Sequence, residues 1–427
     1  SSTLALTKSV TVRGVTGHWK DVVLDATSSR RAVEIYDSAA ALRDLTVKNG
    51  RCYYSGAGVY IFDGGTLTNC RVTANNAVDN SMHGAGVYNV NGTLLGCVID
   101  GNYGGGGTPR GLGLLQTGST ALTDRCIITN NVSSSSSTAN GSGAGVWMNG
   151  GIVRNSVIAR NNLSGTTAAT STFATGVSIE GGRIENCAVY DNFYIGVEQT
   201  RVVGLNRTGG AVTNCIISGN GDRASVVANW AGNASAFSHC FTSPINGIDG
   251  GVSDATRGYI EHDGLYVLFT GSPLVDAGAD AAWMGAAADL DGQARVVNGT
   301  VDIGPREYTA AGFACPFTAN VYAGLDAFDA TLTTHPSGGA EGVVYYWDLD
   351  GDGTTDESGS GKAVVTAHFA TPGVTTATLC ATNGAGLGAT WSYDFIVDPS
   401  TLYVVKNASN PQKPYATWAT AAASIHD

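Results

Sequence analysis

The sequence is poor in charged residues, and poorer in basic than in acidic ones. Only 14% of its 427 residues are charged, against about 25% in an average soluble domain. The 23 lysines and arginines are outnumbered by 35 aspartates and glutamates, which gives a net charge of −12. A surface of this sign repels phosphate backbones and anionic membranes. Nucleic acid is therefore not an expected partner.

Long apolar runs are also absent. No stretch approaches the ~18 residues that cross a bilayer, so no membrane span is predicted. Residues 1–20 lack a basic start followed by an apolar stretch, and we expect a soluble chain from which any leader has been removed. With 43% hydrophobic residues, the chain can bury a large core in two or three domains.

Glycine, by contrast, is abundant: 59 residues, about twice the usual share. Many of these glycines stand in phrases that recur about every 30 residues. A first phrase such as GAGVY occupies residues 56–60, 84–88, 111–114, 143–147 and 174–177. A second phrase such as GTLTNC occupies residues 65–70, 92–97, 151–156, 182–187 and 210–215. Polar turns with asparagine end most periods, at residues 74–76, 130–131, 160–162, 191–192 and 219–220.

Each period holds two or three short apolar strands separated by Gly or Asn, the residues that best tolerate left-handed backbone. No helix fits between them. Parallel strands normally need a long crossover, but a chain that coils fully round stacks each strand on its predecessor at about 4.8 Å. The repeat therefore predicts an all-β fold with a right-handed parallel β-helix (a solenoid) over residues 1–256.

The cysteines follow the repeat. One phase of it is occupied by Cys70, Cys97, Cys126, Ser156, Cys187 and Cys215. We expect a buried ladder of thiols, since free cysteine is among the most buried residue types. Disulfides along the ladder are disfavoured, because parallel Cβ atoms ~4.8 Å apart exceed the ~3.5–4.5 Å that the bond requires. A zinc site is less expected still, because no Cys-x-x-Cys or His pair accompanies these cysteines.

A tail with acidic turns follows the repeats. It reads SPLVDAG at residues 272–278, DLDGQAR at 289–295 and NGTVDIGPREY at 298–308. With these phrases the chain resembles bacterial surface proteins that have a pectate-lyase-like β-helix. The resemblance implies a β-helix tail over residues 257–310. We expect it to cap the strand edges at the end of the solenoid, with Arg295 pairing with Asp302 or Glu307. A catalytic role for these acids is the lesser alternative.

Residues 311–398 lose the glycine phrases and show longer alternating runs, a β-sandwich pattern. The phrases WDLDGDG at 347–353, HF at 368–369 and ATNGAG at 381–386 resemble a PKD-type, immunoglobulin-like domain. Such domains are spacers or adhesion units of extracellular proteins, and the resemblance implies that role. Cys315 and Cys380 stand at opposite ends of this segment. A disulfide between them is a possibility that would fit an oxidising compartment.

Four aspartates gather in one loop of this domain: Asp348, Asp350, Asp352 and Asp356. Alternating carboxylates before a turn glycine suit calcium, a hard cation that prefers oxygen ligands. The loop departs from the EF-hand pattern, because its twelfth position is Gly359 rather than Glu. The alternative is a metal-free turn, held by hydrogen bonds from backbone amides to the Asp side chains.

Residues 399–427 read as a strand followed by an Ala-rich helix, which in the family resembles the start of a β-helix. Residue 1, conversely, begins partway into a coil. We therefore expect residues 399–427 to cap the first coil of the next copy, in a tandem array or between separate chains, and such a head-to-tail contact generates a filament. The residues expected to carry this self-assembly are Leu402, Tyr403, Val404, Val405, Trp418 and Ile425.

An outward stripe of aromatic residues is the remaining candidate site. Tyr60, Tyr88 and Trp147 follow the valine of the first phrase and are expected to contact either glycans or protein. A lyase or glycoside hydrolase is the enzymatic alternative, but the base and the paired carboxylates that such chemistry needs do not share one phase of the repeat. The sequence favours an extracellular, cell-surface structural or adhesive protein over a polysaccharide-binding or polysaccharide-degrading one.

Overall fold

The computed structural model describes most of the chain up to residue 398. The described residues are 3–53, 55–78, 83–104, 110–133, 143–165, 173–196, 202–221, 226–255, 258–262, 265–268, 272–308, 313–336, 341–384 and 388–398. They form two compact units. The first comprises described residues within 1–258 and 273–307, and the second comprises those within 259–272 and 308–398.

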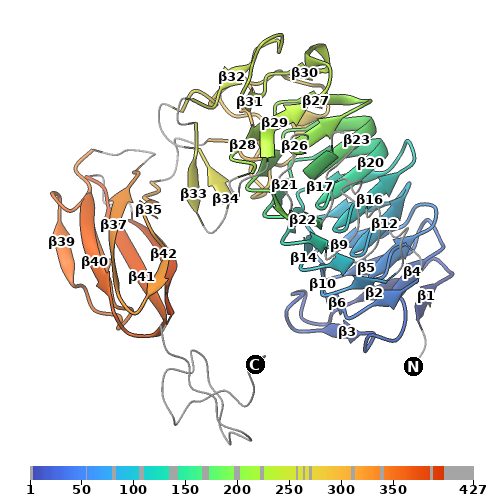
Figure 1. Cartoon of the computed structure of the whole chain (residues 1–427), viewed down its shortest axis with the longest axis horizontal. Helices are drawn as coiled ribbons and strands as arrows, with labels where there is room; N and C mark the ends of the chain where they lie inside the picture. The colour runs from blue at the N-terminus through green and yellow to red at the C-terminus, as the bar shows by residue number, and fades with distance from the viewer. Residues whose placement is uncertain are drawn as a thin grey trace, which may run out of the picture. The chain divides into compact units, whose positions relative to one another are not determined.

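The first unit is a parallel β-solenoid whose coils follow one another in chain order, from blue at β1 to green in Figure 1. Its strands form four stacks. The first stack contains β1 (Leu4–Leu6), β4 (Val33–Ile35), β8 (Val59–Ile61), β12 (Val87–Val90), β16 (Leu114–Thr117), β20 (Val146–Arg154), β23 (Phe173–Glu185), β26 (Val202–Arg207) and β29 (Val226–Ala231). The second contains β2 (Thr11–Arg13), β5 (Ala41–Arg43), β9 (Thr66–Thr68), β13 (Thr93–Leu95), β17 (Leu122–Asp124), β27 (Ala211–Thr213) and β30 (Phe237–Ser238), with β20 and β23 running through both stacks.

The other two stacks complete each coil. The third contains β3 (Val23–Asp25), β6 (Thr46–Lys48), β10 (Arg71–Thr73), β14 (Val98–Asp100), β18 (Ile127–Thr129), β21 (Val157–Ala159), β24 (Ala188–Tyr190), β28 (Ile216–Ser218), β31 (Phe241–Thr242) and β32 (Val252–Ser253). The fourth contains β7 (Arg51–Cys52), β11 (Asn76–Ala77), β15 (Tyr103–Gly104), β19 (Val132–Ser133), β22 (Asn162–Gly165) and β25 (Phe193–Gly196). The predicted all-β fold with a parallel β-helix is confirmed.

The coils turn at residues with left-handed backbone, which explains the glycines and asparagines of the repeat. Between the second and third stacks, the chain turns at a row of positive-φ residues that we call the corner row. It consists of Asp44, Asn69, Gly96, Arg125, Asn155, Asn186, Asn214 and His239. L-residues with a β-carbon resist this conformation, and Gly and Asn resist it least. Six of these residues directly precede a member of the cysteine ladder, and His239 precedes Cys240.

An asparagine ladder joins the coils at the next corner. The Nδ2 atoms of Asn102 and Asn131 donate to the Oδ1 atoms of Asn131 and Asn161 at 2.9 Å. The main-chain N–H of each donor residue also donates to the same oxygen, at 3.1 and 3.0 Å. The same pair of bonds links Asn75 to Asn102, Asn161 to Asn192 and Asn192 to Asn220. Because Asn75, Asn102, Asn131, Asn161 and Asn192 are fully buried, the ladder satisfies polar groups that would otherwise be costly to bury.

The ladder makes a testable contribution to stability. We expect Asn131→Ala to lower the free energy of unfolding by about 2–4 kcal/mol, because it removes several buried bonds and takes away the acceptor of the main-chain N–H of Asn102. Chemical denaturation measures this loss. The control is Asn76→Ala, next to the ladder but only half-buried, which should cost less than about 0.5 kcal/mol. Equal costs for the two variants would contradict a special role for the ladder.

The cysteine ladder lies in the solenoid core as predicted, and Cys240 extends it by one coil. None of the nine cysteines forms a disulfide. Ser156 takes the place of a thiol: its hydroxyl donates to the carbonyl of Arg154 at 2.6 Å and accepts from the N–H of Cys126 at 3.0 Å. Burial raises the pKa of Cys97, Cys215 and Cys240 far above that of an ordinary thiol, so these groups stay protonated and act as small apolar side chains.

Residues of the last coil cover part of its own core. The indole of Trp230 donates to the carbonyl of Pro244 at 2.9 Å and lies against the ring of Phe237. Ile248 is 8% exposed and packs into the solenoid core. The short helix η1 (Ala234–Ala236) lies in the same stretch of chain. The strand edges are not covered among the described residues, because β29 and β32 pair on one side only.

The second unit contains two sheets and a separate hairpin. The strands of one sheet are β35 (Phe317–Ala319), β37 (Phe328–Thr334) and β40 (Val364–Phe369), and the strands of the other are β36 (Ala323–Leu325), β42 (Gly388–Asp398), β41 (Gly373–Thr382), β38 (Val344–Asp348) and β39 (Glu357–Gly359). The hairpin pairs β33 (Ile260–His262) with β34 (Leu265–Val267). Phe317, Trp347 and Phe395 from both sheets share one buried core, which is compatible with the predicted β-sandwich.

The disulfide considered between Cys315 and Cys380 is not formed. Cys315 is buried in the core of this unit, whereas Cys380 is exposed. The two residues that flank Cys380 on β41, Leu379 and Ala381, point into the core. Because side chains alternate along a strand, the thiol of Cys380 points outward. The sequence showed that both cysteines belong to this domain, but it did not show on which face of the sheet each side chain lies.

Candidate functional site

The first coil of the solenoid is open on one side. Strand β1 pairs only with β4, β2 only with β5, and β3 only with β6 among the described residues. Beneath these edges, Leu4, Val12 and Leu24 are only partly buried although they pack against the core. The three edges therefore present both unpaired backbone and apolar surface, a combination that favours association with another strand.

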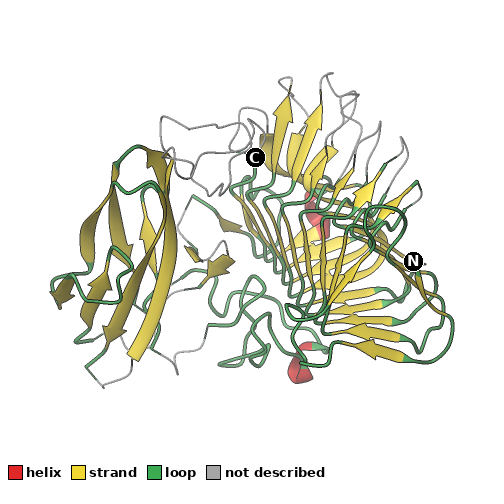
Figure 2. Ribbon diagram, turned by 90° about the horizontal axis from the view of Figure 1, so that it is seen from below, coloured by secondary structure: helices red, strands yellow, loops and turns green. Residues whose placement is uncertain are grey.

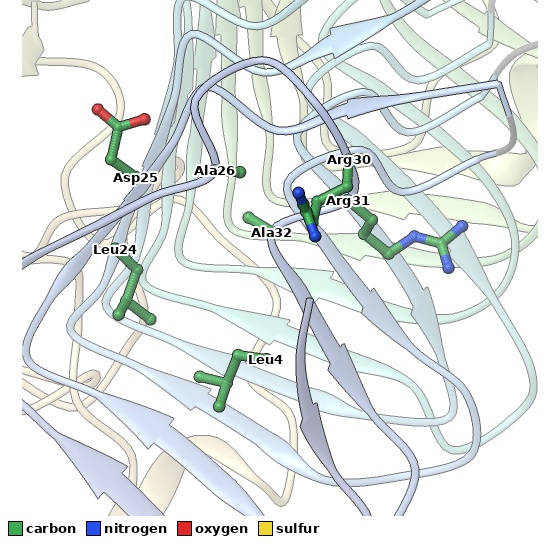
Figure 3. A pocket seen from close by; sticks show the side chains of 7 residues that line it. All are labelled: Leu4, Leu24, Asp25, Ala26, Arg30, Arg31 and Ala32. Carbon is green, nitrogen blue, oxygen red and sulfur yellow. The ribbon is translucent and has the colours of Figure 1, made fainter. Parts of the chain in front are cut away.

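A cavity of about 100 Å³ lies at this open end. Its apolar wall consists of Leu4, Leu24, Ala26 and Ala32, as Figure 3 shows. Asp25, Arg30 and Arg31 line its polar part. The cavity marks where the core of the first coil lacks the layer that every later coil receives from its predecessor.

The aromatic stripe begins near this end as a column of stacked rings. Tyr60 lies in register with Tyr88, and their rings stack with centroids 4.7 Å apart. The ring of Phe62 stacks on Tyr60 at 3.9 Å and on Tyr36 at 4.1 Å, and the guanidinium of Arg31 lies 4.9 Å from the Tyr60 centroid. Since the ring faces contact one another, those of Tyr60 are largely used within the protein.

Trp147, the third predicted contact residue, is only 5% exposed. Its indole donates to Glu180 at 3.1 Å, and the guanidinium of Arg110 lies 5.0 Å from the ring centroid. Leu115, which separates Tyr88 from Trp147 in the stripe, is 4% exposed. The structure brings Tyr60 and Tyr88 together, while Trp147 belongs to a covered part of the same stack.

The tail docks along the corner row. Asn214 recognises Ala279 with both ends of its amide: Nδ2 donates to the carbonyl at 2.9 Å, and Oδ1 accepts from the N–H at 2.8 Å. Asn186 donates to the carbonyl of Asp302 at 3.3 Å. Asn155 likewise donates to the carbonyl of Ala288 at 3.2 Å, just after the short helix η2 (Met284–Ala286), one of the two red helices in Figure 2.

This docking covers the side of the last coils. The outward residues Val157, Ala188 and Ile216 of the third stack are almost completely buried. In earlier coils the same row is only half-buried, as at Val98 and Ile127. We expected from the sequence an end cap, but the tail covers a lateral face. The signal was present in the sequence, because the asparagines of the second phrase serve as the docking amides.

A buried ion pair holds the tail together. Arg295 donates to Glu307 at 2.8 Å, and both side chains are fully buried. The same nitrogen of Arg295 donates to the carbonyls of Asp302 and Gly304. Glu307 was one of the two predicted partners of Arg295. The carboxylate of Asp302 instead accepts the N–H of Asp276 at 2.7 Å. Burial raises the pKa of Glu307 to about 8 and lowers that of Arg295.

Tail stability should therefore depend on pH. The folded chain raises the pKa of Glu307 from its ordinary value of 4.5 to about 8, so it binds this proton more tightly than the unfolded chain does. The contribution of this proton to the free energy of unfolding is complete below the ordinary pKa and is lost as pH rises through about 8. We expect Tm to fall between about pH 5 and pH 8 and then to level off, and Glu307→Gln to reduce that slope. The exposed control Glu341→Gln should retain the wild-type slope. If Glu307→Gln retains it as well, this explanation is wrong.

Three of the four predicted calcium ligands come together. Asp348, Asp350 and Asp356 place carboxylate oxygens within 4.8 Å of one another, and Asp352 is outside this group. Backbone amides already orient these side chains: Asp348 accepts from Gly351 and Gly353 at 2.7 and 2.9 Å. The loop thus contains both the oxygen cluster that suits calcium and the amide bonds of the metal-free alternative.

The predicted self-assembly residues Leu402, Tyr403, Val404, Val405, Trp418 and Ile425 lie outside the described residues. Within the described part of the chain, no helix has the length and hydropathy needed to span a membrane. In comparisons with known proteins, no family model, no curated protein and no solved structure matches this chain.

Proposed function

We propose that this chain is an extracellular structural or adhesive unit of a cell surface, in which successive units join head to tail into a rod. The contrast between the two ends of the solenoid supports this proposal most. The first coil has three open strand edges over partly exposed core residues. At the last coil, β29 and β32 also pair on one side only among the described residues, but Trp230 and Ile248 cover the core there.

This contrast indicates how the units join. Because Trp230 and Ile248 cover the core of the last coil, we do not expect two solenoids to stack directly end on end. In this proposal, a segment of another copy supplies the layer over Leu4 and Leu24. The sequence of residues 399–427 has the required pattern, a β-rich run followed by an apolar helix pattern with Trp418 and Ile425. Added to β1 as a strand, this segment would bind through main-chain hydrogen bonds.

The main-chain geometry of β1 offers a selective test. Leu4 donates to Ala32, and the carbonyl of Leu6 accepts from Tyr36. In a parallel pair the bonding direction alternates along the strand, so the N–H of Ala5 faces the open side. Ala5→Pro should block strand addition without removing a bond of the folded unit. We expect wild type to sediment as concentration-dependent oligomers and Ala5→Pro to sediment as monomers.

Two controls accompany this experiment. Ala5→Thr keeps the N–H and suits a strand, so it should assemble like wild type. Trp418→Ala tests the complementary segment and should weaken assembly. Wild type that stays monomeric at every concentration, or Ala5→Pro that assembles normally, would refute head-to-tail joining.

Calcium binding by Asp348, Asp350 and Asp356 is part of the proposed extracellular role. Three convergent carboxylates, held in place by backbone amides, form a suitable start of an oxygen site for this cation. The ion would bind both Asp348 and Asp356, which lie on either side of the loop, and would hold their carboxylates together. The loop would then be rigid between β38 and β39.

We expect calcium to raise the Tm of the second unit and to bind measurably in calorimetry, since a ligand that prefers the folded state stabilises it. Asp350→Asn should abolish both effects. Asp329→Asn, an exposed acid outside the loop, serves as the control and should retain them. Identical melting of wild type in calcium and in chelator would eliminate the site.

A further inference from the structure

The corner row docks main chain at two separate places. At the start of the solenoid, Asn69 donates to the carbonyl of Gly17 at 3.2 Å. At the other end, Asn155, Asn186 and Asn214 donate to carbonyls of the tail. Two segments far apart in sequence thus use the same row in the same way. The row acts as a docking line for irregular chain segments.

A tryptophan accompanies each docked segment. The guanidinium of Arg71 lies 5.3 Å from the ring centroid of Trp19, in the first segment. The guanidinium of Arg154 lies 4.2 Å from the ring centroid of Trp283, in the tail. Both are cation–π contacts with arginines that project from the solenoid wall. The shared mode is a main-chain bond to the corner row plus an indole on a nearby arginine.

Between these two segments, two coils carry no such partner among the described residues. Their corner residues are Gly96 and Arg125. A Cβ built on Gly96 meets no atom within 4 Å, so the surface is open there. Leu95, Val98 and Ile127 project outward beside this corner and are half-buried. The next residue of the Val98–Ile127 row is Val157, which is fully buried on the tail-covered face.

Arg125 lies in this gap with its guanidinium available. Its main-chain N–H donates to Arg154 at 3.2 Å, but its side chain makes no ion pair and no ring contact within the part of the chain that the structure describes. The neighbouring arginines form ion pairs: Arg71 pairs with Asp100 at 2.6 Å, and Arg154 pairs with Asp124 at 2.9 Å. Arg125 stands in the corner row itself, whereas Arg71 lies two residues after Asn69 and Arg154 directly precedes Asn155. All three arginines lie at or beside the corners, and Arg125 is the one on which no indole lies among the described residues.

We propose that the surface formed by Leu95, Gly96, Val98, Arg125 and Ile127 binds a peptide segment bearing an aromatic side chain. The segment places its ring on Arg125 and small or apolar neighbours on Val98 and Ile127. The occupant is a slender segment rather than a second solenoid, because the covering segments at Trp19 and Trp283 border this surface on both sides. Continuity with the tail interface indicates that a ring on an arginine is the element of binding that the sites share.

A peptide copied from the tail provides the probe. It spans residues 276–289 (DAGADAAWMGAAAD), with blocked ends, and is titrated into the intact 427-residue protein by calorimetry. Its three acidic groups also suit the unpaired charge of Arg125. We expect saturable binding that weakens about tenfold, the loss of one cation–π contact, when the tryptophan of the peptide is replaced by alanine.

Variants of the protein locate the binding site. Arg125→Gly retains a residue that tolerates positive φ, as Gly96 does, adds no docking amide, and should weaken binding about tenfold for the same reason. Val98→Asp should weaken it further. Val364→Asp, at an exposed valine of the second unit, is the matched control and should bind like wild type. Melting curves establish that each variant is folded, and Arg125→Gly alone decides the matter if Val98→Asp unfolds.

The failing outcomes are equally clear. Absence of binding to wild type overturns the proposal. So does binding that Arg125→Gly leaves unchanged, because the peptide then occupies another place, such as the tail's own position. Neither outcome bears on head-to-tail joining, which is measured by sedimentation without peptide.

Discussion

The left-handed turn at each corner is the constraint on which this structure depends. A parallel stack exists only if every coil returns to the same register, so each corner must change direction within one or two residues. Positive φ at residues such as Asn69, Asn155 and Asn214 achieves this. The strand pairing, the cysteine ladder and the asparagine ladder all follow, because each requires equivalent residues to lie directly above one another.

The corners also supply hydrogen-bonding groups outside the backbone ladders. At one corner, buried asparagines bond to each other along the solenoid. At the corner row, asparagines face outward and bind main chain of Gly17 and of the tail. Asparagine thus either joins successive coils or binds a covering segment, and whether its side chain points into the solenoid or out of it decides which. The proposed peptide-binding surface is the part of the corner row that neither covering segment contacts.

The repeat pattern was sufficient to predict the fold, because Gly and Asn at fixed spacing report backbone conformation directly. The core position of the cysteines followed from the same period. Other features depend on which face a side chain takes after folding. The partner of Arg295, the outward thiol of Cys380 and the burial of Trp147 are of this kind. The tail was recognised as a unit, but its lateral position depends on contacts with Asn155, Asn186 and Asn214, more than 60 residues away in sequence.

The central claim is that the open first coil is completed by a strand from another unit. Cryo-electron microscopy of the concentrated protein tests it most directly, by imaging the junction at a resolution that separates strands. The account predicts density for an added strand about 4.8 Å from β1, in line with the stack below it. Junctions without a strand beside β1, or particles that are all single units, would contradict it.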